Sequence, residues 1–243
     1  MSAAPASEIV FLPGFDGVGE LRAPFVEALG AWHPARAIAY PNRRLDSLNG
    51  YARHAATHVD AESRPVLVAE SFSGLVAARW ASKDPHVAGL VLCGSFARSP
   101  VPWAAIGASM PSMAQFIGAH FMTPAGLVSQ EPARRRWSEA LATALRSLDR
   151  EVIAERLRII ATEDVGAELA ALHIPIVLAH FDDDLVIGRE ARSYLESACP
   201  HAEIVRVPGP HFAIETRPRE SAQAMRAAIA SIFGSAANRA SRR

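Results

Sequence analysis

Three residues of the types used in nucleophilic catalysis occur along the chain in the order serine, aspartate, histidine: Ser71, Asp184 and His211. A serine hydroxyl becomes a useful nucleophile when an imidazole takes its proton, and a carboxylate can orient and stabilise that imidazole. The order alone is weak support, because a chain of 243 residues contains many such triples. The surrounding segments must therefore bring the three side chains together.

The serine follows an apolar run and precedes a helical pattern. Residues 66–68 are Val-Leu-Val, Ser71 comes just past their expected carboxyl end, and a helical pattern opens at Leu75. Ala69 and Ser73 flank the serine, so the sharp strand-turn-helix crossing meets only small side chains. Ser73 is a second candidate, but we expect it in the first helical turn. The simpler alternative is that Ser71 only caps a helix.

The aspartate and the histidine each follow a predicted strand. Residues 175–181 form an apolar run before Asp182, Asp183 and Asp184, and residues 202–207 form the last strand before His211. The carboxyl ends of parallel strands meet at one edge of a sheet, and ligand sites in open α/β sheets lie there. We therefore expect these loops to converge on Ser71.

The segments around the serine and the histidine resemble those of the α/β-hydrolase family. Its nucleophile elbow has the form G-x-S-x-G, and this chain has Ala69 and Ser73 in place of the two glycines. Residues 207–212 resemble the family's strand-to-histidine loop, and the chain order Ser, Asp, His is also that of the family. The resemblance extends from residue 8 to residue 233 and is greatest toward serine carboxylesterases.

The resemblance also suggests the acid. The family pattern is Gly-x-x-Asp-x-x-Val, and aligning Phe181 with the glycine places Asp184 at the acid and Ile187 at the valine. The absent glycine leaves the register open by about one residue, so Asp183 is the alternative.

The resemblance further implies an oxyanion hole made of two backbone N–H groups. One belongs to Phe72, directly after the nucleophile, and the other to Phe15, in the glycine-rich loop after the first strand. Such a donor typically contributes about 3 kcal/mol to transition-state stabilisation. The alternative for residues 13–19 is an ordinary strand-to-helix loop. They match neither a P-loop nor a dinucleotide-binding fingerprint.

The rest of the chain predicts how these loops are carried. Strands alternate with helices, which predicts a mostly parallel sheet of about six strands flanked by helices. We expect one domain over residues 1–243, with a core of residues 8–97 and 173–233. Residues 234–243 are expected to form a disordered tail. Residues 98–172 carry helical patterns without a strand signal and resemble the lid of many α/β-hydrolases. A helical layer without a gating role is the alternative.

The early part of this insertion is the part best able to reach Ser71. We expect its apolar side chains to form a substrate pocket, with candidates Trp103, Met110, Met113 and Phe116. Residues 134–136 are three arginines, which we interpret as a solvated helix face.

Composition excludes several classes of partner. Lys plus Arg equals Asp plus Glu, so the formal net charge is zero and nothing indicates nucleic-acid or membrane binding. No apolar run approaches the roughly 20 residues of a membrane span, and residues 1–7 do not resemble a signal peptide. Cys93 and Cys199 fit a reducing, cytoplasmic environment, although one disulfide is the alternative. His180 beside Asp182 is too little for a metal site, so we expect no metal and no cofactor.

The resemblance implies an acyl-serine hydrolase that acts on a small-molecule carboxylic ester. A serine nucleophile argues against the dehalogenases and epoxide hydrolases, which attack with an aspartate. Acyl transfer, thioester hydrolysis and lactone hydrolysis could use the same residues. A ligand-binding protein that keeps the triad without turnover is an alternative of another class. The sequence does not determine the oligomeric state.

Overall fold

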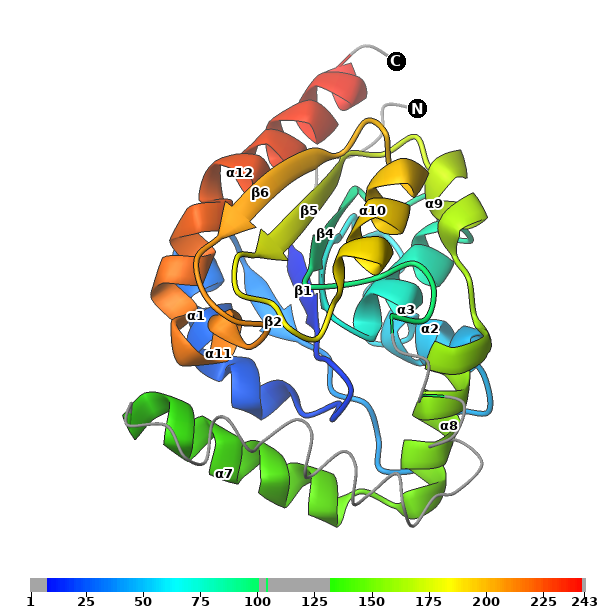
Figure 1. Ribbon diagram of the computed structural model, residues 1–243. Coiled ribbons are helices and arrows are strands. Elements are labelled where there is room, and N and C mark those ends of the chain that lie inside the picture. Colours follow the sequence, from blue (N-terminus) through cyan, green and yellow to red (C-terminus); the bar gives the residue numbers. More distant parts are fainter. Residues whose placement is uncertain (1–7, 101–103, 105–131, 242–243) are drawn as a thin grey trace.

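The computed structural model describes residues 8–100, 104 and 132–241. Within them, six parallel strands form one sheet in the order β2-β1-β3-β4-β5-β6 (Figure 1). This confirms the α/β fold with a parallel sheet of about six strands. The strands are β1 (Ile9–Leu12), β2 (Ala35–Ala37), β3 (Val66–Glu70), β4 (Gly89–Cys93), β5 (Ile176–Phe181) and β6 (Glu203–Val207).

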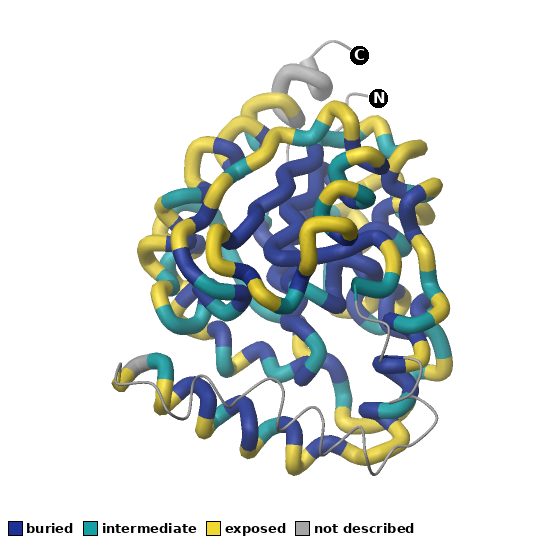
Figure 2. Tube along the Cα trace, viewed as in Figure 1, coloured by how far each residue is buried: buried dark blue, intermediate teal, exposed yellow. Residues whose placement is uncertain are grey.

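The central strands are buried and largely apolar because helices cover both faces of the sheet (Figure 2). Along β1, Val10 and Leu12 pack toward one layer of helices, whereas Ile9 and Phe11 pack toward the other. The first layer holds α2 (Leu48–Ala56), α3 (Ser73–Ala81), α9 (Gly166–Ala171) and α10 (Arg189–Ala198). The second holds α1 (Ala23–Gly30), α11 (Ala213–Thr216) and α12 (Pro218–Ser241), and a short 3-10 helix, η1 (Gly19–Arg22), precedes α1.

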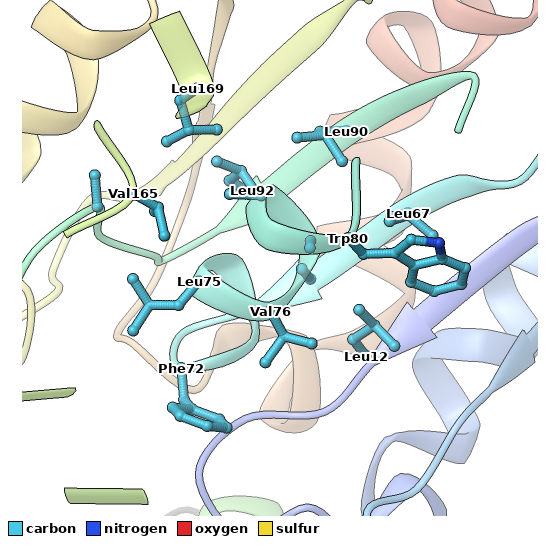
Figure 3. Close-up of a cluster of buried hydrophobic side chains, with 14 of the residues drawn as sticks. Leu12, Leu67, Phe72, Leu75, Val76, Trp80, Leu90, Leu92, Val165 and Leu169 are labelled. Carbon is cyan, nitrogen blue, oxygen red and sulfur yellow. The ribbon is translucent and has the colours of Figure 1, made fainter. Parts of the chain in front are cut away.

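Helix α3 is the part of this core that fixes the position of the serine turn. Its side chains Leu75, Val76 and Trp80 are buried against Leu67 and Leu90 of the central strands (Figure 3). Burying one such side chain contributes about 1.5–3 kcal/mol. Helix α3, which begins two residues after Ser71, is therefore held firmly against β3 and β4.

The helical insertion contains α7 (Pro132–Ser147) and α8 (Arg150–Thr162). Asp149 caps α8 by accepting a 2.8 Å hydrogen bond from the N–H of Glu151. The two helices share an apolar cluster that also contacts Phe15 and Phe212, in loops at the carboxyl ends of the strands. Figure 1 shows α7 beyond that edge of the sheet. The cluster comprises Trp137, Leu141, Leu145, Leu148, Ile153 and Leu157.

One expected boundary is wrong. Residues 234–243 were expected to form a tail, but α12 continues through Ser241. Alanine and arginine favour helix, and no proline or later glycine stops it after Gly234. Cys93 and Cys199 are both buried free thiols, so the alternative of a disulfide between them does not hold. Among the described residues, no helix combines the length and apolar character needed to cross a membrane.

Candidate active site

Ser71 occupies a strained turn between β3 and α3. Its φ is 50°, in the left-handed region that residues other than glycine rarely adopt. The turn is held from both sides: the Ser71 N–H donates to the Cys93 carbonyl at 3.0 Å, and the Ser95 hydroxyl donates to the Ser71 carbonyl at 2.7 Å. A Cβ on Gly74 would lie 1.7 Å from Ser95 Oγ, so only glycine fits there. The expected sharp turn is therefore present, with small residues where the crossing is close.

Ser71, His211 and Asp184 form a continuous hydrogen-bonded relay. His211 Nε2 lies 3.2 Å from Ser71 Oγ, and His211 Nδ1 lies 2.9 Å from Asp184 Oδ2. A carboxylate can only accept, so Nδ1 carries the proton and Nε2 is free to accept from the serine hydroxyl. This tautomer is the one that a general base for Ser71 requires.

The structure brings Asp184, and not Asp183, to the imidazole. Asp184 is buried, and its Oδ1 accepts hydrogen bonds from the N–H groups of Val186 at 2.8 Å and Ile187 at 2.9 Å. Burial opposes ionisation, but His211 and these N–H groups outweigh it and hold the pKa of Asp184 below its usual value. Asp183 is exposed, and Asp182 forms a surface ion pair with Arg206.

The missing glycine at Phe181 has a structural compensation. The Phe181 ring lies edge-on to the His211 ring, with centroids 6.3 Å apart. It fills the space beside Gly94, where an added Cβ would lie 2.6 Å from the ring. A glycine on the neighbouring strand end therefore makes room for the phenylalanine, and the acid keeps its register.

The two expected oxyanion donors lie at adjoining strand ends. Phe72 follows Ser71 at the start of α3, and Phe15 lies in the loop after β1, which pairs with β3. Within the described residues, neither N–H group donates a hydrogen bond to another protein group. Ser73 does not face His211: its hydroxyl donates to the Pro13 carbonyl and lies 2.6 Å from the Tyr40 hydroxyl.

A buried ion cluster behind the serine was missed by the sequence analysis. The Arg22 guanidinium contacts Asp16 at 2.7 Å, Glu70 at 2.8 Å and Glu215 at 3.1 Å, and all four side chains are at most 2% exposed. The available signal was Glu70 itself, a carboxylate that ends an otherwise apolar strand.

The pKa values of the two glutamates in this cluster are shifted in opposite directions. Burial opposes ionisation of Glu70, but Arg22 holds its pKa below the usual value. Burial, reinforced by the negative charge of Glu70, raises the pKa of Glu215 well above the usual value. The raised pKa of Glu215 favours its neutral form beside the ionised Glu70.

The described part of the insertion supplies an apolar wall near the relay. The ring centroids of Trp137 in α7 and Phe212 are 4.3 Å apart, and those of Phe212 and His211 are 5.0 Å apart. Sequence analysis placed the pocket at Trp103, Met110, Met113 and Phe116, and all four lie outside the described residues. Trp137 and Phe212 were missed as wall residues, although Trp137 begins a regular apolar stripe.

The described residues show no cluster suited to a metal ion. His180 instead pairs with Glu196 of α10 at 3.0 Å. In the arginine run, Arg135 and Arg136 are exposed and Arg134 is half-buried, as expected of a solvated helix face.

Comparisons with known proteins bear on the family and the fold. The alpha/beta hydrolase family matches residues 9–224, whereas no curated protein matches the sequence. A hydrolase from Pseudomonas aeruginosa is similar in structure, with a TM-score of 0.76, 20% identity, and coverage of 96% of this chain and 92% of the other. An esterase from Rhodococcus sp. is similar with a TM-score of 0.72 and 22% identity, over 93% of this chain and 91% of the esterase. An enol-lactonase from Burkholderia xenovorans is similar with a TM-score of 0.73 and 18% identity, over 95% of this chain and 92% of the lactonase. At these identities the structural likeness supports the fold alone.

The raised pKa of Glu215 predicts a pH-dependent stability. An acid whose pKa is raised in the folded state contributes its full stabilisation below the unfolded-state pKa, about 4.3. That contribution is lost as pH rises toward the folded-state pKa. The loss approaches about 1.4 kcal/mol per pH unit for one proton. Glu215→Gln mimics the neutral acid, so its unfolding free energy should fall less than that of the wild type between pH 5 and pH 8 in urea titrations.

Glu220→Gln, an exposed change on α12, serves as the control and should leave the wild-type pH profile unchanged. Parallel profiles for Glu215→Gln and the wild type would contradict a protonated Glu215.

Proposed function

The chain belongs to the alpha/beta hydrolase family, and from the geometry of its site we propose that it is a serine hydrolase that cleaves carboxylic esters through an acyl-enzyme intermediate. Ser71 is the nucleophile, His211 the general base and acid, and Asp184 the residue that orients His211. The hydrogen-bonded relay of these three side chains, with Ser71 on a strained turn, is the observation that carries the proposal.

The reaction follows from the positions of the protons. Ser71 Oγ attacks the ester carbonyl as His211 Nε2 takes its proton, and the N–H groups of Phe72 and Phe15 receive the developing oxyanion. The C–O bond to the alcohol then breaks, and His211 returns the proton to the departing alkoxide. A water molecule repeats the sequence on the acyl-enzyme and releases the acid. The ionised Asp184 stabilises the imidazolium in both halves.

The substrate class rests on the apolar wall beside the relay. Phe15, Phe212 and Trp137 belong to one apolar cluster next to His211, which favours an uncharged acyl group of short to medium length. The insertion would then shape the acyl side of the site as a lid. Acyl transfer and thioester or lactone hydrolysis differ only in the leaving group or acceptor, and a binding protein would give no turnover.

The first prediction separates the two serines. Ser71→Ala should lower turnover of activated esters by several orders of magnitude, leaving about 10³-fold over water from the oxyanion hole. Ser73→Ala should keep most of the activity, because its hydroxyl contacts Pro13 and Tyr40 rather than His211. The assay is p-nitrophenyl ester hydrolysis, with mass spectrometry of the organophosphonate adduct. An inactive Ser73→Ala with an active Ser71→Ala would refute the assignment.

The second prediction separates the aspartates. Asp184→Asn should lower kcat by about 10⁴-fold, because the amide favours the wrong imidazole tautomer. Asp183→Asn should leave kcat close to that of the wild type, since Asp183 is exposed. Steady-state kinetics on both variants decides, and comparable losses would count against Asp184 as the acid.

The third prediction concerns the substrate. Values of kcat/KM should be highest for p-nitrophenyl esters between butyrate and octanoate, with broad selectivity, because one methylene changes discrimination by only about 1–3 kcal/mol. A chelator should have no effect, since the proposed steps use side chains and backbone alone. Faster turnover of amides, of thioesters or of charged acyl groups would overturn this substrate class but not the triad. A wild-type protein with neither a product burst nor a phosphonate adduct would be a binding protein.

A further inference from the structure

The loop of residues 13–18, here called the oxyanion loop, has its donor peptide between Gly14 and Phe15. The carbonyl of that peptide accepts a 3.1 Å hydrogen bond from the Gly17 N–H inside the turn. Because a trans peptide is planar, its N–H points to the side opposite its carbonyl. The direction of the Phe15 N–H therefore depends on how the peptides before and after it are held.

A buried carboxylate holds the peptide before it. The Gly14 N–H donates to Glu70 Oε2 at 3.0 Å. Arg22 fixes Glu70 in turn, with Nε 2.8 Å from Oε2 and Nη2 2.9 Å from Oε1. Glu70 directly precedes Ser71, so one short backbone segment carries both the nucleophile and the anchor of the opposing loop.

A buried guanidinium holds the peptide after it. Arg156 Nη1 donates to the Phe15 carbonyl at 2.6 Å. Arg156 belongs to α8 of the insertion and is 0% exposed. Its Nε donates to the Tyr51 hydroxyl at 3.0 Å, and its guanidinium carbon lies 5.6 Å from the centre of the Tyr40 ring. These contacts hold the guanidinium in place independently of its hydrogen bond to the oxyanion loop.

We propose that Glu70 and Arg156 are positioning residues that hold the two peptides flanking the Gly14–Phe15 peptide and so aim the Phe15 N–H at the substrate oxyanion. The inference rests on the proposed serine-hydrolase function and deepens it. It gives the insertion a role in the chemistry, because α8 supplies one of the two anchors. The residues come from opposite sides of the loop and carry opposite charges, which match the N–H and the carbonyl that they hold.

The test uses Glu70→Gln, Arg156→Met and Arg156→Lys in the full chain, with active sites counted by phosphonate titration so that unfolded protein does not contribute. For Glu70→Gln and Arg156→Met, kcat per active site should fall about 10- to 100-fold with KM changed less than about twofold, since the lost interaction acts mainly in the transition state. Arg156→Lys should recover part of the loss, because an ammonium can still donate to the Phe15 carbonyl.

A second readout separates positioning from general damage. A trifluoromethyl ketone forms a tetrahedral adduct with Ser71 and places an oxyanion in the hole, so its affinity should fall by the same factor as kcat/KM. The affinity for an uncharged alcohol product should not change.

Two control variants remove ion pairs elsewhere that are more exposed than the contacts of Glu70 and Arg156. Arg79→Met breaks contacts of α3 to Glu163 and Glu168, and Glu8→Gln breaks a pair with Arg36 at the amino end of the sheet. Both controls should lower the melting temperature without changing kcat per active site.

Three results would overturn the inference. Unchanged kcat and inhibitor affinity in an active Glu70→Gln or Arg156→Met would do so while leaving the proposed function intact. Loss of titratable sites with normal kcat per site would show a structural role only. A wild-type protein without ester turnover or phosphonate labelling would overturn the proposed function and this inference with it.

Discussion

The left-handed backbone at Ser71 is the constraint on which the site depends. A residue other than glycine in this region costs of order 1–3 kcal/mol, so the surrounding structure must impose it. Here the strand ends and the buried face of α3 do so, together with hydrogen bonds to Cys93 and from Ser95. The result is a hydroxyl raised above the sheet edge. Space for it comes from Gly74 and from the small residues around the turn.

Charge buried under that turn is the second organising feature. Removing ions from water costs several kcal/mol for each, even in a relaxed protein, so a buried cluster is not in itself a source of stability. Arg22 offsets that cost for Asp16 and Glu70, whereas burial raises the pKa of Glu215 and favours its neutral form. What the cluster provides is fixed geometry: through Glu70 it joins the strand before the nucleophile to the loop after β1.

The insertion is joined to the core by two kinds of contact. Apolar side chains of α7 and α8 cover Phe15 and Phe212. Polar side chains of α8 contact loops of the core. Arg156 donates to the oxyanion loop, and Glu155 accepts hydrogen bonds from the N–H groups of Leu45 and Asp46. Through these buried polar contacts α8 is anchored to the α/β core, while α7 contributes an apolar surface.

The sequence by itself determined the features that depend on local order. The alternation of strand and helix, the small residues around Ser71, the aspartate register after β5 and the histidine loop after β6 all lie within short segments, and apolar periodicity or side-chain size reports them directly. Parallel strands then require the three loops to meet, so the convergence of Ser71, Asp184 and His211 followed from the topology. The end of α12 was misjudged, because a run of small and polar residues is compatible with both helix and coil.

Only the tertiary structure decided which distant groups pair. Glu70 and Arg22, or Phe15 and Arg156, carry no mutual signal along the chain, because a buried polar contact depends on where separate elements come to rest. The same holds for Phe181 beside Gly94, where the volume of one strand end compensates for the other. Sequence patterns report the face that a residue presents, whereas hydrogen-bond partners and protonation states depend on what lies opposite that face. The fold and the chemistry of the relay were therefore predictable, and the buried charges that hold it in place were not.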